Sequence, residues 1–334
     1  PRTTEPRPEH PPEVPLAIHD LTVAYQRKPV IWDIELNIPE GKLVGIVGPN
    51  GAAKTTILDA VALLAERLGA HLRSTNDEEP AGPTISQKDI RIGELAAQIQ
   101  CTAELGGRAV TWALSKTLQG ATAVEDKALS EFVSTLREGW EAGDRVAPLV
   151  VYYRIDRGTV DVPDRIRTKH VFDLQSAWIE ALDGSSSFRH FVEWFRDRED
   201  LENEVRLNSH PWHRDAHLRA VRRAIVTLLG EAFSEVRYRR MPAPGRLTVK
   251  KEELELSIDQ LSAGERAVIA LAGDLARRLA LANPDLDDPL RAPAVVLIDE
   301  IELHMHPGWQ RRIIPDLQKT FPACQLPVSY THLT

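Results

Sequence analysis

The stretch GIVGPNGAAKTT contains the residues of this sequence that are best suited to binding phosphate. It follows a short apolar run and precedes an amphipathic segment, so we expect a strand, a loop and a helix in that order. The backbone N–H groups of such a loop, together with the helix N-terminus, can surround a phosphate chain. Lys54 would then neutralise the outer phosphates during catalysis, and the Thr55 hydroxyl would bind Mg²⁺. The predicted nucleotide-binding residues are Gly48, Pro49, Asn50, Gly51, Ala52, Ala53, Lys54, Thr55 and Thr56.

One residue of this stretch departs from the usual phosphate-loop pattern. Glycine is expected before the lysine, but Ala53 occupies that position. If the position needs a positive φ, alanine costs about 1 kcal/mol, and its methyl group would also crowd the phosphates. We therefore expect the chain to bind ATP more weakly than its Ala53→Gly variant.

Two adjacent carboxylates follow a second apolar run, in VVLIDEIELHMHP. A buried strand from Val295 to Ile298 would place Asp299 and Glu300 at its carboxyl end. In a phosphoryl-transfer site, the first carboxylate holds Mg²⁺ and the second orients or deprotonates the attacking water. The structural alternative is a strand that ends in acids at its solvent edge. The phosphate-binding stretch in the same chain favours the catalytic interpretation.

The hexapeptide LSAGER, Leu261 to Arg266, supports two interpretations. Ser262 and Glu265 have the spacing of a capping box, which would explain the motif as an ordinary helix start. A capped helix N-terminus that includes Gly264 is also suited to binding an anion. The position of the motif, before the acidic strand, favours the second interpretation.

The composition is that of a globular protein with no global affinity for polyanions. Hydrophobic residues make up 43% and charged residues 27% of the 334 residues, and the net charge is −8. This charge excludes a basic field over the whole surface, so any contact with nucleic acid must be local. Cys101 and Cys324 have no CxxC spacing, which argues against a zinc ribbon or a disulfide framework and for the cytoplasm. No apolar run is long enough to span a bilayer.

The order of predicted elements indicates an α/β fold with a mostly parallel central sheet, an antiparallel edge region and a helical insertion. Strands are expected over 16–38, 42–48, 148–155, 247–262 and 292–304, with a hairpin at Gly106-Gly107. Helices are expected over 55–68, 128–142, 188–206, 213–233 and 264–281. We predict a disordered proline-rich tail over 1–15, an ATP-binding core over 16–163 and 233–334, and a helical lid insertion over 164–232.

The motifs GPNGAAKTT, LSAGER and VVLIDE resemble the Walker A, signature and Walker B motifs of the ABC ATPase superfamily. The resemblance covers nearly all of the chain after Pro15. It implies a P-loop NTPase fold with an ABC-type head, and ATP and Mg²⁺ as cofactors. It also implies an ATP-dependent homodimer in which Ser262 and Gly264 of one head contact the γ-phosphate bound by the other.

The resemblance also assigns roles to residues outside the three motifs. Tyr25 lies where the family has the aromatic residue that stacks on adenine, although a strand-surface tyrosine would also explain it. His332 lies where the family has its catalytic switch histidine. However, Pro327 lies in the strand that would lead to it, and a central strand should avoid proline. His332 is thus either the switch or an accident of the chain end. The candidates for the glutamine loop are Gln87, Gln98 and Gln100.

Two subfamilies are similar to different parts of the chain. Residues 16–56 resemble the ATP-binding subunit of a metal-type ABC importer. The segments PLVVYYRIDR, FRHFVEWFRDREDLENE and IDEIELHMHPGWQ resemble RecF/SMC-like and OLD-type AAA ATPases, which act in DNA repair or phage defence. The larger part of the chain favours this second group, with DNA or a nuclease as partner. The alternatives are an importer subunit docked on a membrane permease, or a nucleotide-gated switch with weak turnover.

Two further clusters have a functional and a structural interpretation. On an extended segment, Glu302, His304 and His306 would share one face and could hold a metal, although they also belong to the segment that follows the Walker B acids. The densest basic region comprises Arg219, Arg222, Arg223, Arg237, Arg239 and Arg240. It is either a DNA-facing patch or a solvated face paired with nearby acids, and the second interpretation is favoured.

Overall fold

The computed structural model describes most of the chain, in segments separated by gaps. The described residues are 16–25, 28–38, 42–48, 54–74, 82–90, 93–105, 107–141, 147–155, 174–183, 188–241, 245–302 and 305–330. Over 16–37 and at 141, only the backbone is described. No helix within these segments is long and apolar enough to cross a membrane.

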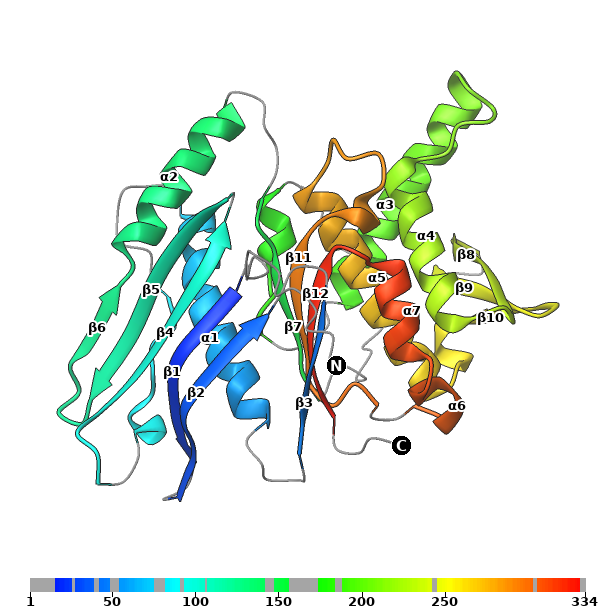
Figure 1. Ribbon diagram of the computed structural model, residues 1–334. Helices are drawn as coiled ribbons and strands as arrows, with labels where there is room; N and C mark the ends of the chain where they lie inside the picture. Colours follow the sequence, from blue (N-terminus) through cyan, green and yellow to red (C-terminus); the bar gives the residue numbers. More distant parts are fainter. Residues whose placement is uncertain are drawn as a thin grey trace, which may run out of the picture.

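Five strands form an antiparallel sheet on one side of the molecule (Figure 1). Their order is β2 (Lys28–Ile38), β1 (Leu16–Tyr25), β4 (Ala96–Leu105), β5 (Arg108–Thr117) and β6 (Thr122–Glu125). The antiparallel pairing of β1 with β2 confirms the prediction for 16–38. The predicted hairpin is also confirmed, because β4 and β5 pair up to Leu105 and Arg108, on either side of the two glycines.

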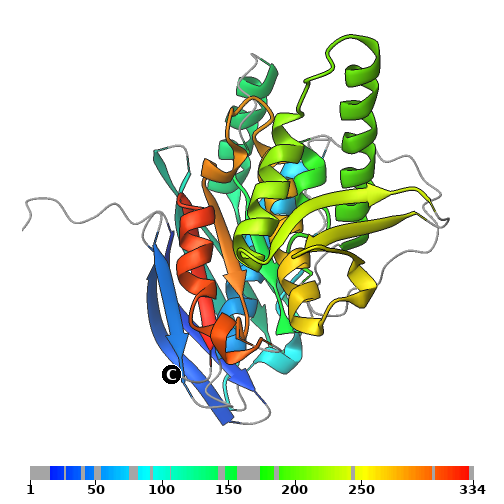
Figure 2. The ribbon, with the colours of Figure 1, turned by 90° about the vertical axis from the view of Figure 1, so that its right-hand side faces the viewer.

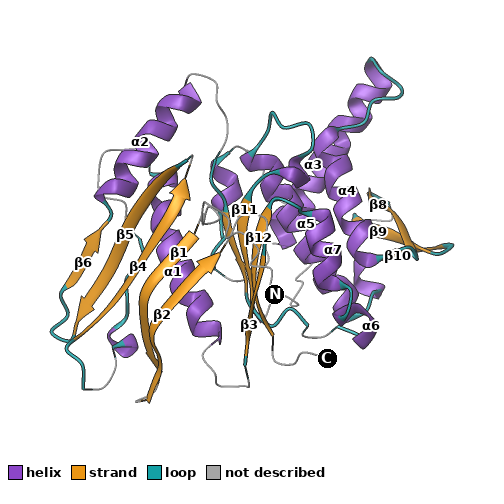
Figure 3. Cartoon of the chain, viewed as in Figure 1, coloured by secondary structure: helices purple, strands orange, loops and turns teal. Residues whose placement is uncertain are grey.

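A second, parallel sheet forms the centre of the molecule (Figure 3). Its order is β3 (Leu43–Val47), β12 (Cys324–Tyr330), β11 (Ala294–Ile298) and β7 (Val150–Tyr153). Every pairing in it is parallel, which confirms the predicted central sheet. The strand predicted over 42–48 is confirmed, but its predicted burial is wrong: β3 lies at the edge of the four described strands and its residues are half-buried or exposed.

The expectation that proline would exclude a central strand before His332 is also wrong. Pro327 lies within β12, which has β3 on one side and β11 on the other. Leu326 donates its N–H toward β3, to the carbonyl of Lys42 at 3.0 Å, so the nitrogen of Pro327 faces β11. The described pairing with β11 joins Val295 with Gln325 and Ile298 with Val328, and skips Pro327. The sheet therefore loses one hydrogen bond locally and continues.

Helix α1 (Lys54–Arg73) lies between the two sheets and contacts strands of both (Figure 1). The apolar residues whose spacing predicted this helix are buried, among them Ile57, Val61 and Leu64. Trp112 of β5 donates its indole N–H to the carbonyl of Leu64 at 2.9 Å, which attaches the antiparallel sheet to α1. Helix α2 (Lys127–Glu141) packs against β5.

Helix α5 (Ala263–Ala282) is buried along nearly its whole length. Helices α3 (Phe188–Asn208) and α4 (Ala216–Leu229) pack on it, and their far ends project from the body of the molecule (Figure 2). A three-stranded antiparallel sheet lies beside them, with the order β10 (Leu254–Ser257), β9 (Arg246–Lys251) and β8 (Phe233–Arg239). The remaining helical elements are η1 (Gln87–Asp89), η3 (Gln175–Trp178), η4 (Ile258–Gln260), η5 (Pro289–Arg291), α6 (Pro307–Gln310) and α7 (Ile313–Thr320).

The predicted helix over 213–233 is wrong at its end. Helix α4 stops at Leu229 because Gly230 adopts a φ of 98°, and Phe233 already begins β8. The division into core and lid remains a prediction. Buried residues of α3 and α4, such as Phe191 and Val221, belong to the same hydrophobic core as α5.

A buried ionic cluster joins α5 to β7 and η3. Asp274 accepts hydrogen bonds from Arg277 and Arg278, each at 2.7 Å, and from the hydroxyl of Tyr153 at 2.9 Å. Arg278 also donates to the carbonyls of Ala177 and Ile179. Burial alone would raise the pKa of Asp274, but the charges of the two arginines outweigh it and lower that pKa. The carboxylate therefore stays ionised and compensates two buried cations.

We predict that Asp274→Ala strongly destabilises the fold, because it leaves two buried guanidinium groups without their carboxylate. The expected loss in the free energy of unfolding is about 3–5 kcal/mol. Urea denaturation of the variant and the parent protein measures it. Glu253→Ala is the control, since its side chain is 93% exposed and pairs with the neighbouring Lys250 at the surface. Equal midpoints for Asp274→Ala and the parent would contradict the prediction.

Candidate functional site

The start of α1 brings the predicted phosphate-binding lysine to the end of β3. Lys54 is buried, and its ammonium group donates a hydrogen bond to the carbonyl of Gly48 at 2.8 Å. Thr55 and Thr56 follow in the first turn of the helix, where backbone N–H groups have no partner within the helix. The intervening predicted residues, 49–53, lie outside the described part of the chain, and this includes Ala53.

Thr55 and Asp299, the two predicted metal ligands, lie in direct contact. The Thr55 hydroxyl donates to Oδ2 of Asp299 at 2.8 Å, across 244 positions of sequence. Asp299 is buried at the end of β11, and its backbone N–H donates to the carbonyl of Tyr153 at 2.8 Å. A hydroxyl and a carboxylate oxygen at this spacing are the hard oxygen donors that suit Mg²⁺.

Ser329 of β12 links the two adjacent acids, and the sequence analysis missed it. Its hydroxyl donates to Oδ1 of Asp299 and accepts the backbone N–H of Glu300 at 2.8 Å. The side chain is fully buried. Only its position, as a small polar residue within an apolar strand, could have indicated a role.

Glu300 has an unusual backbone that turns the chain sharply after β11. Its φ of 43° lies in the left-handed region, which non-glycine residues rarely adopt. Strain of this kind persists where the surrounding structure imposes it, and it is common at functional sites. The hydrogen bond to Ser329 holds the strained backbone in place.

A third carboxylate, Asp59 of α1, lies near this site and was also missed. It accepts hydrogen bonds from the hydroxyl of Tyr152 at 3.0 Å and from Arg154 at 2.8 Å. Burial raises the pKa of Asp59, and the charge of Asp299 raises it further. Burial, followed by the charges of Asp59 and Asp299, likewise raises the pKa of Tyr152. The end of β7 therefore contributes polar groups beside Asp299.

The candidate glutamines lie elsewhere. Gln87 is in η1 and donates to the carbonyl of Leu118 at 3.2 Å. Gln98 and Gln100 lie on β4 of the antiparallel sheet, where they pair with Ser115 and Ala113. In the described part of the chain, none of the three hydrogen-bonds to Asp299 or Asp59.

The signature-like motif forms the N-terminus of α5. Ser262 and Glu265 make both hydrogen bonds of a capping box, at 3.3 Å and 2.7 Å, which confirms the structural interpretation of their spacing. Ser262 is nevertheless exposed. Together with Gly264 it lines a cavity of about 530 Å³, whose walls also include Lys251, Trp309 and Arg312. Another molecule can therefore reach this helix end.

The other predicted site residues are described only in part. Tyr25 ends β1, but its side chain lies outside the described part of the chain, as do His304 and His332. His306 caps α6, accepting the N–H of Gly308 at 3.2 Å through Nδ1. Among the described residues, no group of three histidines, cysteines or acids is arranged to hold a metal ion.

The predicted pairing of the basic region with acids is confirmed for most of its members. Arg222 pairs with Glu199 and Glu202. The other pairs join Arg223 to Asp288, Arg237 to Glu235, Arg239 to Glu255 and Arg240 to Asp200. These pairs make much of the region a mixed-charge surface.

Comparison with known proteins identifies similar sequences over most of the chain. The family described as "AAA domain, putative AbiEii toxin, Type IV TA system" matches residues 125–326. The Retron Ec83 probable ATPase of Escherichia coli is 29% identical over 352 residues, which cover 86% of this chain and 63% of that protein. This chain thus spans less than two thirds of that relative's length.

Two further similar proteins correspond to the two resemblances predicted from the sequence, one to ABC importer subunits and one to SMC-like ATPases. The manganese transport system ATP-binding protein MntB of Bacillus subtilis (strain 168) is 42% identical over 79 residues, 24% of this chain and 29% of that protein. An SMC head solved in complex with the C-winged helix domain of ScpA has a TM-score of 0.52 at 16% identity, covering 94% of this chain and 90% of that one. The mixed ABC and SMC-like resemblance is confirmed, and the fold is that of a P-loop ATPase head.

We predict that Ser329→Ala weakens metal binding without unfolding the protein. Loss of the hydroxyl frees one oxygen of Asp299 and the backbone of Glu300, and such supporting contacts typically contribute 10-fold or more, so we expect about 10-fold weaker binding. Titration of Mn²⁺ in the presence of a non-hydrolysable ATP analogue, by calorimetry, measures the change. Ser134→Ala, at an exposed serine of α2, is the control. If both variants bind Mn²⁺ equally well, Ser329 does not position Asp299.

Proposed function

The chain belongs to the AAA ATPase family, and we propose that it binds Mg²⁺-ATP where α1 begins and β11 ends, and hydrolyses it there. The observation that carries the proposal is the 2.8 Å hydrogen bond between Thr55 and Asp299. It joins the phosphate-binding stretch to the acidic strand at one point. Phosphoryl transfer requires these two groups around one metal-bound triphosphate.

In this proposal, Gly48 to Thr56 bind the phosphate chain. The first N–H groups of α1 and the positive end of its dipole favour an anion at this position. Lys54 adds a full positive charge beside the same loop, since its ammonium group lies 2.8 Å from the carbonyl of Gly48. When ATP binds, this ammonium group would leave the carbonyl of Gly48 and bind the oxygens of the outer phosphates.

Thr55 and Asp299 are the proposed ligands of the magnesium ion. Bound Mg²⁺ supplies charge neutralisation at the phosphate oxygens. Ser329 occupies one oxygen of Asp299 and leaves the other directed at Thr55. The carboxylate is therefore held in one orientation, with the oxygen Oδ2 facing the Thr55 hydroxyl.

Glu300 is the proposed residue that orients the attacking water and accepts its proton. The strained backbone and the hydrogen bond to Ser329 fix where its side chain leaves β11. A general base must be held within hydrogen-bond reach of the water it deprotonates. Tyr25, for adenine, and His332, for the γ-phosphate, complete the proposed site on the resemblance alone.

We propose that two copies of the chain close around ATP. The ABC resemblance implies that Ser262 and Gly264 of one copy contact the nucleotide of the other. Support comes from the N-terminus of α5, where the exposed Ser262, together with Gly264, lines a cavity that another molecule can enter, and where the helix dipole favours an anion. In this arrangement, the N-terminus of α5 in one copy would complete the ATP site of the other copy.

The biological role that we propose is DNA repair or phage defence, with DNA or a nuclease as partner. The Escherichia coli relative is named as a retron ATPase, and the similarity extends over 86% of this chain. The compartment that we propose is the cytoplasm, because Cys101 and Cys324 are free thiols, as expected in a reducing environment.

A second candidate function is the ATP-binding subunit of an importer on a membrane permease. The likeness to MntB favours it but extends over only 24% of this chain. Stimulation of the ATPase rate by DNA would separate the two, because an importer subunit gives no reason for it. A switch that binds ATP and turns over slowly is the third candidate, supported by Ala53.

We predict that Glu300→Gln slows ATP hydrolysis by about 100-fold or more, because the amide cannot accept the proton of the attacking water. The same variant should accumulate as an ATP-bound dimer, measured by light scattering after size-exclusion chromatography. Glu253→Gln, at an exposed position, is the matched control. A Glu300→Gln chain that stays monomeric in ATP would rule out the dimer.

The composite site can be tested within the same experiment by mixing two inactive chains. Ser262→Asp keeps a good helix cap but places a negative charge where the phosphate of the other copy is expected. Mixing it with Lys54→Ala should restore about a quarter of the parent activity, since half of the dimers then contain one intact site. Activity that stays at the level of each variant alone contradicts a shared site.

We predict that Ala53→Gly binds ATP roughly five-fold more tightly, the equivalent of about 1 kcal/mol. The reason is the expectation that this position of the phosphate loop needs a positive φ, where alanine is costly and its methyl group would crowd the phosphates. Titration of a fluorescent ATP analogue into both proteins checks this. Equal affinities would mean that the backbone at position 53 accommodates alanine without cost.

A further inference from the structure

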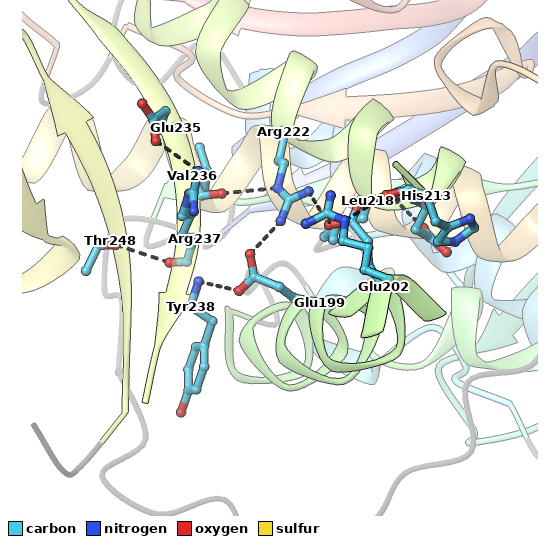
Figure 4. Close-up of polar contacts among 12 residues, drawn as sticks. Glu199, Glu202, His213, Leu218, Arg222, Glu235, Val236, Arg237, Tyr238 and Thr248 are labelled. Carbon is cyan, nitrogen blue, oxygen red and sulfur yellow. Dashed lines mark hydrogen bonds and ion pairs between the residues drawn. The ribbon is translucent and has the colours of Figure 1, made fainter. Parts of the chain in front are cut away.

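A second cavity, of about 260 Å³, lies between α3, α4 and β8, and we call it the arginine pocket (Figure 4). Its lining residues are Glu199, Asn203, Arg206, Arg214, Arg222, Glu235, Val236, Arg237, Tyr238 and Arg239. It shares none of these residues with the proposed ATP site. Five arginines and no lysine in one pocket indicate recognition of a planar or tetrahedral anion.

The inner part of the pocket is a rigid scaffold built around Arg222. Its Nε donates to the carbonyl of Val236 at 3.1 Å, and its two terminal nitrogens bind Glu199 and Glu202. The guanidinium also lies 5.5 Å above the ring of Phe195. Glu199 in turn accepts the backbone N–H of Tyr238 at 2.7 Å, which fixes β8 against α3.

The arginines at the rim are held much less firmly. Arg214 makes no hydrogen bond or ion pair within the described part of the chain. Arg237 is 51% exposed and pairs at 3.1 Å with Glu235, which is equally exposed. Such exposed pairs contribute little, so a ligand can replace the carboxylate at small cost.

Arg206 connects the rim with the scaffold. Its Nε donates to the carbonyl of His213 at 2.7 Å. One terminal nitrogen, Nη2, is buried and makes no hydrogen bond in the described part of the chain, although Glu202 lies 3.2 Å away. The ion pair with Glu202 neutralises this guanidinium, so Arg206 ties the rim to the scaffold and leaves Arg214 and Arg237 as the arginines open to a ligand.

A bulge in β8 forms the wall opposite the helices. The pairing of β8 with β9 shifts register between Ser234 and Arg237, and Glu235 adopts a φ of 46°. Bulges redirect side chains from the regular alternation of a strand. Here the side chains of Glu235 and Arg237 come together beside the pocket (Figure 4).

The charges of the lining favour an anion over a cation. Five arginines against two lining glutamates leave a formal excess of three positive charges, or one if Glu202 and Glu255, which pair with Arg222 and Arg239, are included. The whole chain carries −8, so this excess is a local feature. Guanidinium groups bind phosphate through paired hydrogen bonds, which makes phosphate the matching anion.

We propose that the arginine pocket binds the phosphate groups of a nucleic-acid strand, one of whose bases stacks on Trp212. Trp212 lies in the turn between α3 and α4, two positions before Arg214, and is 93% exposed. Base stacking on an exposed aromatic ring beside basic side chains is how proteins bind single strands. An acidic peptide would match the arginines but would not use the indole. The site is independent of the proposed ATPase activity.

Fluorescence anisotropy of a labelled single-stranded DNA of about 20 nucleotides tests this, without ATP and over a series of salt concentrations. The test variant is Arg214→Glu with Arg237→Glu. The matched control is Arg108→Glu with Arg291→Glu, which changes the net charge equally at exposed arginines outside the pocket, 59% and 76% exposed. Polyglutamate and inorganic phosphate serve as competitors.

We expect the pocket variant to bind roughly 10-fold more weakly or worse, because two charge-assisted contacts are lost. The slope of log K against log salt should fall by about 1.4, while the control pair changes neither quantity. Trp212→Ala should weaken binding by about 5-fold or more, and unchanged binding would overturn the stacking. Competition by inorganic phosphate at matched ionic strength is expected of a pocket that binds phosphate groups, and its absence would contradict the proposal. Equal losses in both charge variants, or complete competition by polyglutamate, would overturn it.

Discussion

The structure depends on one long-range contact, the hydrogen bond between Thr55 and Asp299. It requires the start of α1 and the end of β11 to meet, although 244 positions separate the two residues. The parallel sheet makes this meeting possible, because the carboxyl ends of its strands lie at one edge. Strand β12 lies between β3 and β11 and brings Ser329 to the same edge, where it binds both Asp299 and the backbone of Glu300.

The central sheet is held to the helical side of the molecule by charges as well as by apolar packing. Tyr153 of β7 hydrogen-bonds to Asp274 of α5, and Arg278 of the same helix donates to one carbonyl within η3 and one just after it. Buried ions are costly unless every partner is present, so this cluster tolerates little change. The same α5 carries the exposed Ser262 at its start, which places the proposed partner contact on a rigid helix.

Backbone strain marks both of the sites discussed above. Glu300 beside Asp299 and Glu235 beside the arginine pocket each adopt a positive φ, which is uncommon for residues other than glycine. In each case a neighbouring strand imposes the conformation: β12 through Ser329, and β9 through the register shift opposite β8. The strain directs charged side chains to positions that a regular strand would not allow.

The sequence by itself determined the local features of this protein. Residues close together in the sequence were enough to predict the capping box at Ser262, the hairpin at 106–107 and the limits of α5. The motifs identified Thr55 and Asp299 as a pair of metal ligands. Only the tertiary structure decided which polar groups join them: Ser329, Asp59 and Tyr152 come from separate elements and have no local pattern. It also decided that a proline could enter β12, and that a bulge would convert a mixed-charge surface into a pocket. These outcomes depend on strand order and register, which are set by contacts between distant residues.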